Sequence, residues 1–143
     1  DDKRSSFFGS DFTYEDVSGR AVDDETHTLL RTEKIAGRTT YIIESKPKVQ
    51  ASYARRLSWI DQQNRLPLKE EYFDVRGKKV RVFTADQVKQ VNGHWTVTVR
   101  TMKNLQTGHR TQTRFNNTRY DVGLKKNLFT ERYLRNPPRK WIR

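Results

Sequence analysis

From about residue 26 onward, short runs of alternating apolar and polar residues are separated by turn residues, a pattern that is typical of β-strands. The turns read IAGR (35–38), NRLP (64–67), RGK (76–78), NG (92–93) and QTG (106–108). Strands joined by such short turns pair with their sequence neighbours in an antiparallel meander. We therefore expect about seven strands, at 26–34, 39–46, 52–62, 68–75, 78–90, 94–104 and 110–120.

Asn92-Gly93 predicts a two-residue type I′ turn, which fixes the register of the strands on either side. This register pairs Val88 with Val97. One face of the hairpin then carries Val80, Val82, Val88, Trp95, Val97 and Val99. The other face carries Lys79, Arg81, Lys89, Thr96, Thr98 and Arg100. The alternation therefore predicts one apolar and one basic face.

The turn near Gly108 leaves two registers open for the last strand. A two-residue loop would place Arg110 and Arg114 on the valine face. A three-residue loop, with Gly108 in the left-handed conformation, places the alternate residues there: Thr111, Thr113 and Phe115. Because a slip of one residue exchanges the two faces, we prefer the second register, which keeps Phe115 with the valines.

A short helix is predicted before the first strand. Thr13 has the position of an N-cap and Asp16 is the third helical residue, which together form a capping box with Asp in place of the usual Glu. Phe12 and Val17 have the spacing of a hydrophobic staple, and Gly19 can end the helix.

A second short helix is predicted near the end of the chain. Thr130 follows Phe129 at its start, and Asn136-Pro137 end it after Leu134. Phe129 and Leu134 again have the spacing of a staple. The two helices would either cover the edges of the sheet or gate a cavity.

Composition and charge narrow the range of partners. The chain has 143 residues, 33% hydrophobic and 32% charged, which suits one domain with a thin core. Its net charge of +12 predicts attraction to nucleic acid, an anionic membrane surface or an acidic partner. The sequence contains no cysteine, which excludes disulfides and thiolate chemistry. No apolar run approaches the ~18 residues of a membrane span.

No pattern in the sequence predicts catalysis or a metal site. The three histidines, His27, His94 and His109, are far apart in the sequence. The GxSxG, HExxH and P-loop patterns are absent. We therefore expect no enzymatic activity, no cofactor and no metal.

The alternation also bears on the choice between nucleic acid and lipid. Sheets that bind nucleic acid place aromatic and basic residues on one face, whereas here the two kinds are separated. The apolar face is either a core covered by the helices or a concave surface that holds an acyl chain. In the second case its ligand-binding residues are Tyr41, Ile43, Trp59, Val80, Val82, Trp95, Val97, Val99 and Phe115.

The segment SFFGSDFTYEDV at 6–17 resembles the F-x-G-[ST]-D-F-[ST]-Y-E-D motif of bacterial outer-membrane lipoprotein-sorting proteins of the LolA-like class. WID at 59–61, EYFDVRGKKV at 71–80, the M-K-N-x-x-T-G-H-x-T run at 102–111 and LFTERYL at 128–134 fit the same family in the same order. The residues that match the two more specific motifs are Ser10, Asp11, Phe12, Tyr14, Glu15 and Asp16, and then Asn104, Thr107, Gly108, His109 and Thr111.

The resemblance implies an unclosed antiparallel half-barrel with helices as a lid over a hydrophobic concavity. It also implies a non-catalytic periplasmic carrier or binding protein for lipid or lipoprotein acyl chains, working with an envelope exporter. Family members have further strands before this segment, so we expect 1–143 to be a single LolA-like β domain that lacks the N-terminal strands of the full fold. Its open sheet edge would then favour a homodimer. The alternatives are a basic nucleic-acid-binding β domain and a structural module of an envelope assembly.

Overall fold

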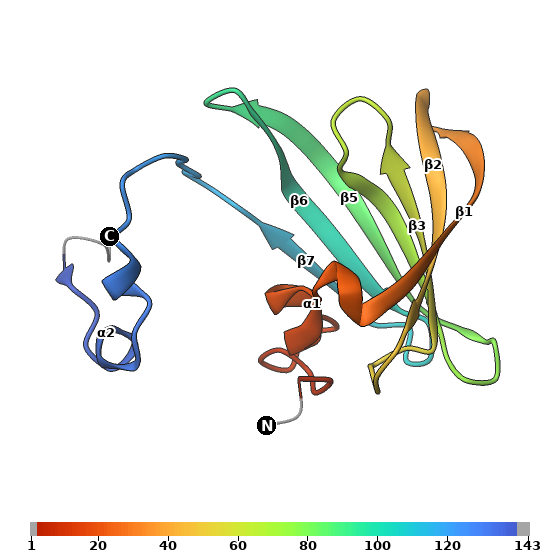
Figure 1. Cartoon of the computed structure of the whole chain (residues 1–143), viewed down its shortest axis with the longest axis horizontal. Helices are drawn as coiled ribbons and strands as arrows, with labels where there is room; N and C mark the ends of the chain where they lie inside the picture. Colours follow the sequence, from red (N-terminus) through yellow and green to blue (C-terminus); the bar gives the residue numbers. More distant parts are fainter. Residues whose placement is uncertain (1–2, 140–143) are drawn as a thin grey trace.

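Seven antiparallel strands form one unclosed, curved sheet in the computed structural model, which describes residues 3–139 (Figure 1). The strands lie in sequence order, from β1 (Glu25–Ile35) at one edge to β7 (Arg110–Arg114) at the other. Between them are β2 (Arg38–Pro47), β3 (Arg55–Asp61), β4 (Pro67–Phe73), β5 (Lys79–Val91) and β6 (His94–Asn104). The predicted seven-stranded meander is confirmed.

The hairpin turns follow the local chemistry of the sequence. Asn92 and Gly93 have φ angles of 49° and 81°, as a type I′ turn requires, and Val88 pairs with Val97 as predicted. Ala36 and Gly37 turn β1 into β2 with φ angles of 47° and 76°. These two hairpins are therefore specified by their turn residues.

Irregular pairing interrupts four of the strand pairs and adds curvature to the sheet. The bulge between β4 and β5 has the largest consequence for the site. Tyr72 pairs with Arg81 and Phe73 pairs with Lys79, so Val80 is an extra residue on β5. Two successive residues at such a bulge can point to the same side of the sheet.

The first helix, α1 (Tyr14–Ser18), begins as predicted. The amide of Asp16 donates to the Thr13 hydroxyl, and the amide of Thr13 donates to the Asp16 carboxylate. Both halves of the capping box are therefore formed. Gly19 ends the helix with a φ of 72°. A short 3₁₀ helix, η1 (Val22–Asp24), leads into β1.

The C-terminal arm (residues 116–139) extends away from the sheet (Figure 1). It contains the 3₁₀ helix η2 (Lys126–Leu128) and α2 (Glu131–Arg135), which starts after Thr130 and ends at Asn136 as predicted. Phe129 is 77% exposed. The predicted staple with Leu134 lies outside the described side chains. In this chain α2 does not cover the sheet.

The hydrophobic core lies where the N-terminal segment (residues 5–19) packs on the sheet. Six buried residues form it: Phe12, Tyr53, Tyr72, Val80, Phe83 and Met102. Phe12 comes from the N-terminal segment, whereas Phe83 and Met102 are paired neighbours on β5 and β6. The segment that begins the chain is therefore part of the core.

Candidate functional site

Strand pairing divides the side chains between two faces of the sheet, because residues directly opposite one another share a face. We call the face on which Phe12 packs the covered face. One row across it, from β2 to β7, is Ile43, Ser58, Glu70, Phe83, Met102 and Thr111. The opposite face is the open face. Its adjacent row is Ile42, Trp59, Lys69, Thr84, Thr101 and Gln112.

The early and late motifs meet at Asp11. The Thr111 hydroxyl donates to the Asp11 carboxylate at 2.8 Å, and the Asp11 amide lies 3.0 Å from the same hydroxyl oxygen. Nδ1 of His109 lies 2.7 Å from that carboxylate. The Asp11 side chain is 7% exposed, whereas that of His109 is 66% exposed. Two segments about a hundred residues apart thus form one joint between the N-terminal segment and β7.

The remaining motif residues shape the two halves of this joint. Ser10 donates to the carbonyl of Phe7 at 2.6 Å, and the Ser10 oxygen also accepts from the amide of Phe12. Thr107 accepts from the amide of His109, and Gly108 has a φ of 76° that favours glycine. Tyr14 packs edge-on against Phe7 with ring centroids 5.2 Å apart.

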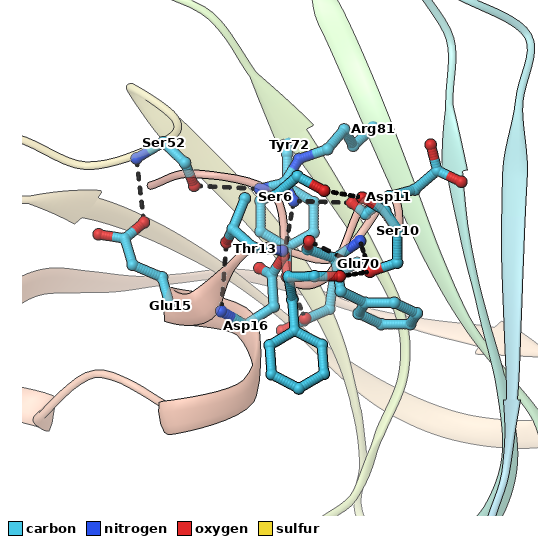
Figure 2. A network of polar contacts seen from close by, with 12 residues as sticks. Ser6, Ser10, Asp11, Thr13, Glu15, Asp16, Ser52, Glu70, Tyr72 and Arg81 are labelled. Carbon is cyan, nitrogen blue, oxygen red and sulfur yellow. Dashed lines mark hydrogen bonds and ion pairs between the residues drawn. The ribbon is translucent and has the colours of Figure 1, made fainter. Parts of the chain in front are cut away.

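Asp16 and Glu15 attach α1 to the sheet (Figure 2). Arg81 on β5 donates to Asp16 at 2.6 Å and to the Ser52 hydroxyl at 3.1 Å. Glu15 accepts from the amide of Ser52 at 3.0 Å and from Arg20 at 2.8 Å. Both carboxylates are buried, and each has a cation, as buried charges require.

A second polar cluster continues from Tyr72 across the covered face. Its hydroxyl donates to Glu70 at 2.7 Å, and Ser58 donates to the same carboxylate at 2.9 Å. Arg56 lies between Glu70 and Glu25, with its guanidinium 3.5 Å from the first carboxylate and 2.7 Å from the second. The covered face thus combines the apolar core with two groups of ion pairs, one around Arg81 and one around Arg56.

The ionisation of this cluster follows from its burial and charges. Burial raises the pKa of Tyr72 well above its usual value, and the carboxylate of Glu70 adds to the effect. Burial likewise raises the pKa of Tyr53, whose hydroxyl donates to Glu25 at 2.7 Å. Burial alone would lower the pKa of Arg56, but the charge of Glu70 and its other neighbours raises it. Both phenols therefore stay neutral and act as hydrogen-bond donors.

The predicted ligand-binding residues do not share one face. Trp59, Val82 and Val99 lie together on the open face, as expected. Tyr41 and Ile43 pair with Ile60 and Ser58 and therefore lie on the covered face. This part of the prediction is wrong because the alternation was assigned one residue out of step in β2.

Val80 and Phe115 are also on the covered face. The bulge in β5 turns Val80 into the core beside Phe12. The ring of Phe115 lies 5.0 Å from the guanidinium of Arg100, which also lies over Phe12. The preferred register for β7 is therefore wrong. Thr111 and Thr113 lie on the covered face.

The predicted division into an apolar face and a basic outer face is also wrong. Arg110 pairs with Lys103 and Arg114 pairs with Val99, so both arginines lie on the open face with the valines. Arg81 was expected to face solvent, but it is 7% exposed and pairs with Tyr72. The loop that connects β6 to β7 is longer than either loop considered, because Asn104 donates its amide to the carbonyl of His109.

Trp95 and Val97 lie near the tip of the β5–β6 hairpin, beyond the last residue pair of β7. Trp95 is 44% exposed, and Val97 is half-buried beside Val88. The C-terminal arm contacts this hairpin at Thr96, whose hydroxyl lies 2.8 Å from the hydroxyl of Tyr120. These two predicted residues are therefore separated from the row that holds Trp59.

Partly exposed apolar side chains continue the covered face across β1, β2 and β3. We call these residues the apolar strip: Leu29, Tyr41, Ile43 and Ile60. Leu29 pairs with Ile43, and Tyr41 pairs with Ile60. Leu29 is 59% exposed, whereas the other three are half-buried. The strip lies beside the region that the N-terminal segment covers. Leu29 and Ile60 were not expected at the site. Leu29 is followed by Leu30 and Ile60 follows Trp59, so neither stands in a simple apolar–polar alternation that would indicate its face.

The open face is a solvated surface with ion pairs over its apolar residues. Glu71 lies between Lys69 at 2.7 Å and Lys79 at 2.9 Å, and these cations lower its pKa although burial alone would raise it. The ammonium of Lys69 also lies 4.4 Å from the ring centroid of Trp59, which is 5% exposed. Trp59 is therefore already shielded from solvent.

Asp61 ends β3 and organises the turn that follows. Its carboxylate is 1% exposed, and it accepts hydrogen bonds from Arg38 and from the amides of Gln63 and Asn64. Burial would raise the pKa of Asp61, but these donors lower it below its usual value. A carboxylate with a lowered pKa stabilises the fold fully above the unfolded-state pKa of about 4. This contribution is lost as the pH falls through the folded-state pKa.

We expect Asp61→Asn to reduce the free energy of unfolding by about 2 kcal/mol at pH 7, because the charged hydrogen bonds to Arg38 are weakened. The difference from the wild type should shrink as the pH falls below about 4, where the wild-type carboxylate also becomes protonated. Urea denaturation at pH 7 and at pH 3 measures both values. A difference that is the same at the two pH values would contradict the ionised role of Asp61.

Neither a metal site nor a membrane-spanning helix is found in residues 3–139. The described part of the chain contains no group of three or more His, Asp or Glu side chains placed to hold a metal ion. Its helices are all too short to cross a membrane.

Comparisons with known proteins agree with this architecture. A family model with the description "Uncharacterized protein" matches residues 1–136. A search of curated proteins found no match. Among solved structures, a domain assigned to outer membrane lipoprotein sorting from Vibrio parahaemolyticus is 30% identical, with a TM-score of 0.87 over 92% of this chain and 57% of its own.

Two further structures are similar. A DUF1329 family protein from Desulfovibrio piger is 29% identical, with a TM-score of 0.83 over 92% of this chain and 56% of its own. A LolA superfamily protein from Nitrosomonas europaea is 22% identical, with a TM-score of 0.66 over 92% of this chain and 60% of its own, and shares the fold. The chain thus spans somewhat more than half the length of these relatives. It belongs to the family whose model matches residues 1–136, and its fold is LolA-like.

Proposed function

We propose that this chain is the binding part of a non-catalytic carrier or binding protein for lipid or lipoprotein acyl chains, located in the periplasm. The apolar strip carries the proposal, because it leaves apolar area exposed on the face that the N-terminal segment only partly covers. Burying such area against an acyl chain contributes about 25 cal/mol per Å². The similarity to a domain assigned to outer membrane lipoprotein sorting supports this choice of ligand.

The strip is a better candidate for the acyl site than the residues of the open face. Trp59 and Val82 lie among the ion pairs of Glu71 with Lys69 and Lys79. A ligand on that face would have to displace ordered charged side chains. On the covered face, by contrast, the exposed part of Leu29 and Ile43 can be buried without breaking an ion pair.

The proposed partners are inferred from the positive charges on the open face and from the edge strand β1. Lys103 lies directly opposite Arg110 on the open face, and two like charges in this position attract an anion. We propose that this face approaches an anionic membrane surface, with an attraction that weakens as salt increases. β1 is an edge strand of 11 residues, so a second copy or an envelope exporter could pair with it.

The test is a matched pair of substitutions on the two faces. Ile43→Thr places a hydroxyl in the apolar strip, and we expect it to weaken binding of a fluorescent fatty acid about fivefold. Val82→Thr makes the same kind of change on the open face and should alter the affinity less than about twofold. Far-ultraviolet circular dichroism checks that both variants are folded. A larger loss with Val82→Thr would place the ligand on the open face, and no binding by the wild type would overturn the proposed function.

A further inference from the structure

Six arginines have buried or half-buried side chains in the described residues: Arg20, Arg38, Arg55, Arg56, Arg81 and Arg100. Five of them form an ion pair with a carboxylate at 3.2 Å or less. Arg100 is the exception, because no carboxylate of residues 3–139 lies within ion-pair distance of it. A half-buried cation without a counter-ion is costly, and an anion bound from outside the chain would remove this cost.

Arg100 is held in a fixed position on the covered face. It lies on β6 between Ala85 of β5 and Thr113 of β7. Its guanidinium carbon lies 4.9 Å from the ring centroid of Phe12 and 5.0 Å from that of Phe115. The two aromatic rings therefore orient the guanidinium plane before any ligand binds.

The donors of Arg100 are not satisfied within the described part of the chain. Its Nε is buried and has no hydrogen-bond partner. The Nε atoms of Arg20 and Arg56 also lack partners, but each of those side chains binds a carboxylate. Burial lowers the pKa of Arg100, and the electrostatic interactions with Asp16 and Tyr72 offset this effect only in part. Cation–π contacts stabilise the charge of the guanidinium but do not satisfy its N–H donors.

The charge of Asp16 favours the charged form of Arg100, but the two side chains are not within ion-pair distance of each other. The carboxylate of Asp16 is engaged by Arg81 at 2.6 Å and by the amide of Thr13 at 2.7 Å. Phe115, next to Arg100, is 42% exposed and offers an apolar surface beside the cation. The surroundings of Arg100 therefore combine an unpaired planar cation with an adjoining apolar surface, which are the two features that an anionic amphiphile requires.

We propose that Arg100 binds the oxyanion, a phosphate or carboxylate, of an amphiphile that lies on the covered face. The proposal rests on the proposed function and adds a head-group preference to it. A guanidinium offers two parallel N–H donors to such an anion, and this bidentate geometry is specific to arginine. The Thr113 hydroxyl, directly opposite in β7, is a further candidate donor.

The experiment compares two probes that share one acyl chain. Lysophosphatidylglycerol carries a phosphate, and the matching monoacylglycerol does not. We expect the wild type to bind the phosphate-bearing probe about tenfold more tightly, as a charge-assisted hydrogen bond implies. Arg100→Met should abolish this preference and leave binding of the neutral probe unchanged. Arg100→Lys should restore part of it. Arg114→Met, on the open face, is the matched control and should keep the full preference.

Two further measurements make the outcomes decisive. Met keeps the apolar contacts with both rings and removes the unpaired charge, so the melting temperature of Arg100→Met should not fall. Inorganic phosphate alone tests whether the site binds a free ion. An equal preference in the wild type and in Arg100→Met would overturn the inference. If neither acylated probe binds, the proposed function fails. In that case, binding of inorganic phosphate that Arg100→Met abolishes would still support an oxyanion site at Arg100. If the wild type does not bind inorganic phosphate either, the inference is overturned as well.

Discussion

Arg81→Met is expected to lower the free energy of unfolding by about 3–5 kcal/mol, because it leaves a buried carboxylate without its cation. The Asp16 side chain is 6% exposed and lies 2.6 Å from Arg81. The substitution also removes the hydrogen bond to Ser52 and the contact of the guanidinium with the Tyr72 ring, whose centroid is 4.6 Å away. Urea denaturation followed by circular dichroism measures the loss.

Two controls separate the ion pair from the rest of the change. Arg76→Met lies in the exposed turn between β4 and β5 and should cost less than about 0.5 kcal/mol. Asp16→Asn removes the negative charge and keeps an oxygen that can accept from Thr13. The double variant Asp16→Asn, Arg81→Met should therefore be more stable than the sum of the single losses predicts. Strict additivity would show that the pair does not hold α1 on the sheet.

The parts of the fold that could be predicted from the sequence depend on contacts between near neighbours. Asn92-Gly93 specifies a turn through its own backbone preferences, and this turn correctly placed Val88 opposite Val97. Thr13 and Asp16 specify the start of α1 by hydrogen bonds within four residues. Neither feature needs the rest of the protein to form.

The prediction of which face of the sheet each residue occupies was wrong where one extra residue, in a strand or a loop, shifts the alternation of the residues around it. Val80 and Val82 have the spacing of a shared face, but Val80 is the extra residue of a bulge and turns into the core. The loop before β7 has the same effect on Phe115, because its length sets the face of every following residue. A local pattern does not encode the position of a bulge, which depends on the packing of both strands.

Charge led to a second kind of error. An arginine in an alternating strand was expected to face solvent, yet Arg81 and Arg100 both point to the covered face. The burial of Arg81 becomes favourable only when the N-terminal segment brings Asp16 onto the sheet, and the same segment places the Phe12 ring beside Arg100. The joint of Asp11 with Thr111 was equally hidden, because it connects two motifs that the sequence shows only as separate segments.

Phe12→Ala tests whether the N-terminal segment is held on the sheet chiefly by this one ring. Phe12 is 3% exposed in the core with Phe83 and Met102, so its removal should lower the free energy of unfolding by about 3–5 kcal/mol. Hydrogen exchange should also become faster at amides whose bonds lie within the segment, such as that of Phe7, which donates to the carbonyl of Phe12.

The matched control is Phe8→Ala. Phe8 is 83% exposed, so its replacement should cost less than about 0.5 kcal/mol. If Phe12→Ala accelerates exchange in residues 5–19 but leaves β3 and β4 protected, the segment opens as a unit while the sheet stays folded. Such opening would also remove one of the two rings beside Arg100, so the segment would control both the stability of the covered face and access of a ligand to it. Equal effects of the two phenylalanine substitutions would show instead that the polar contacts of Asp11 and Asp16 hold the segment without the ring.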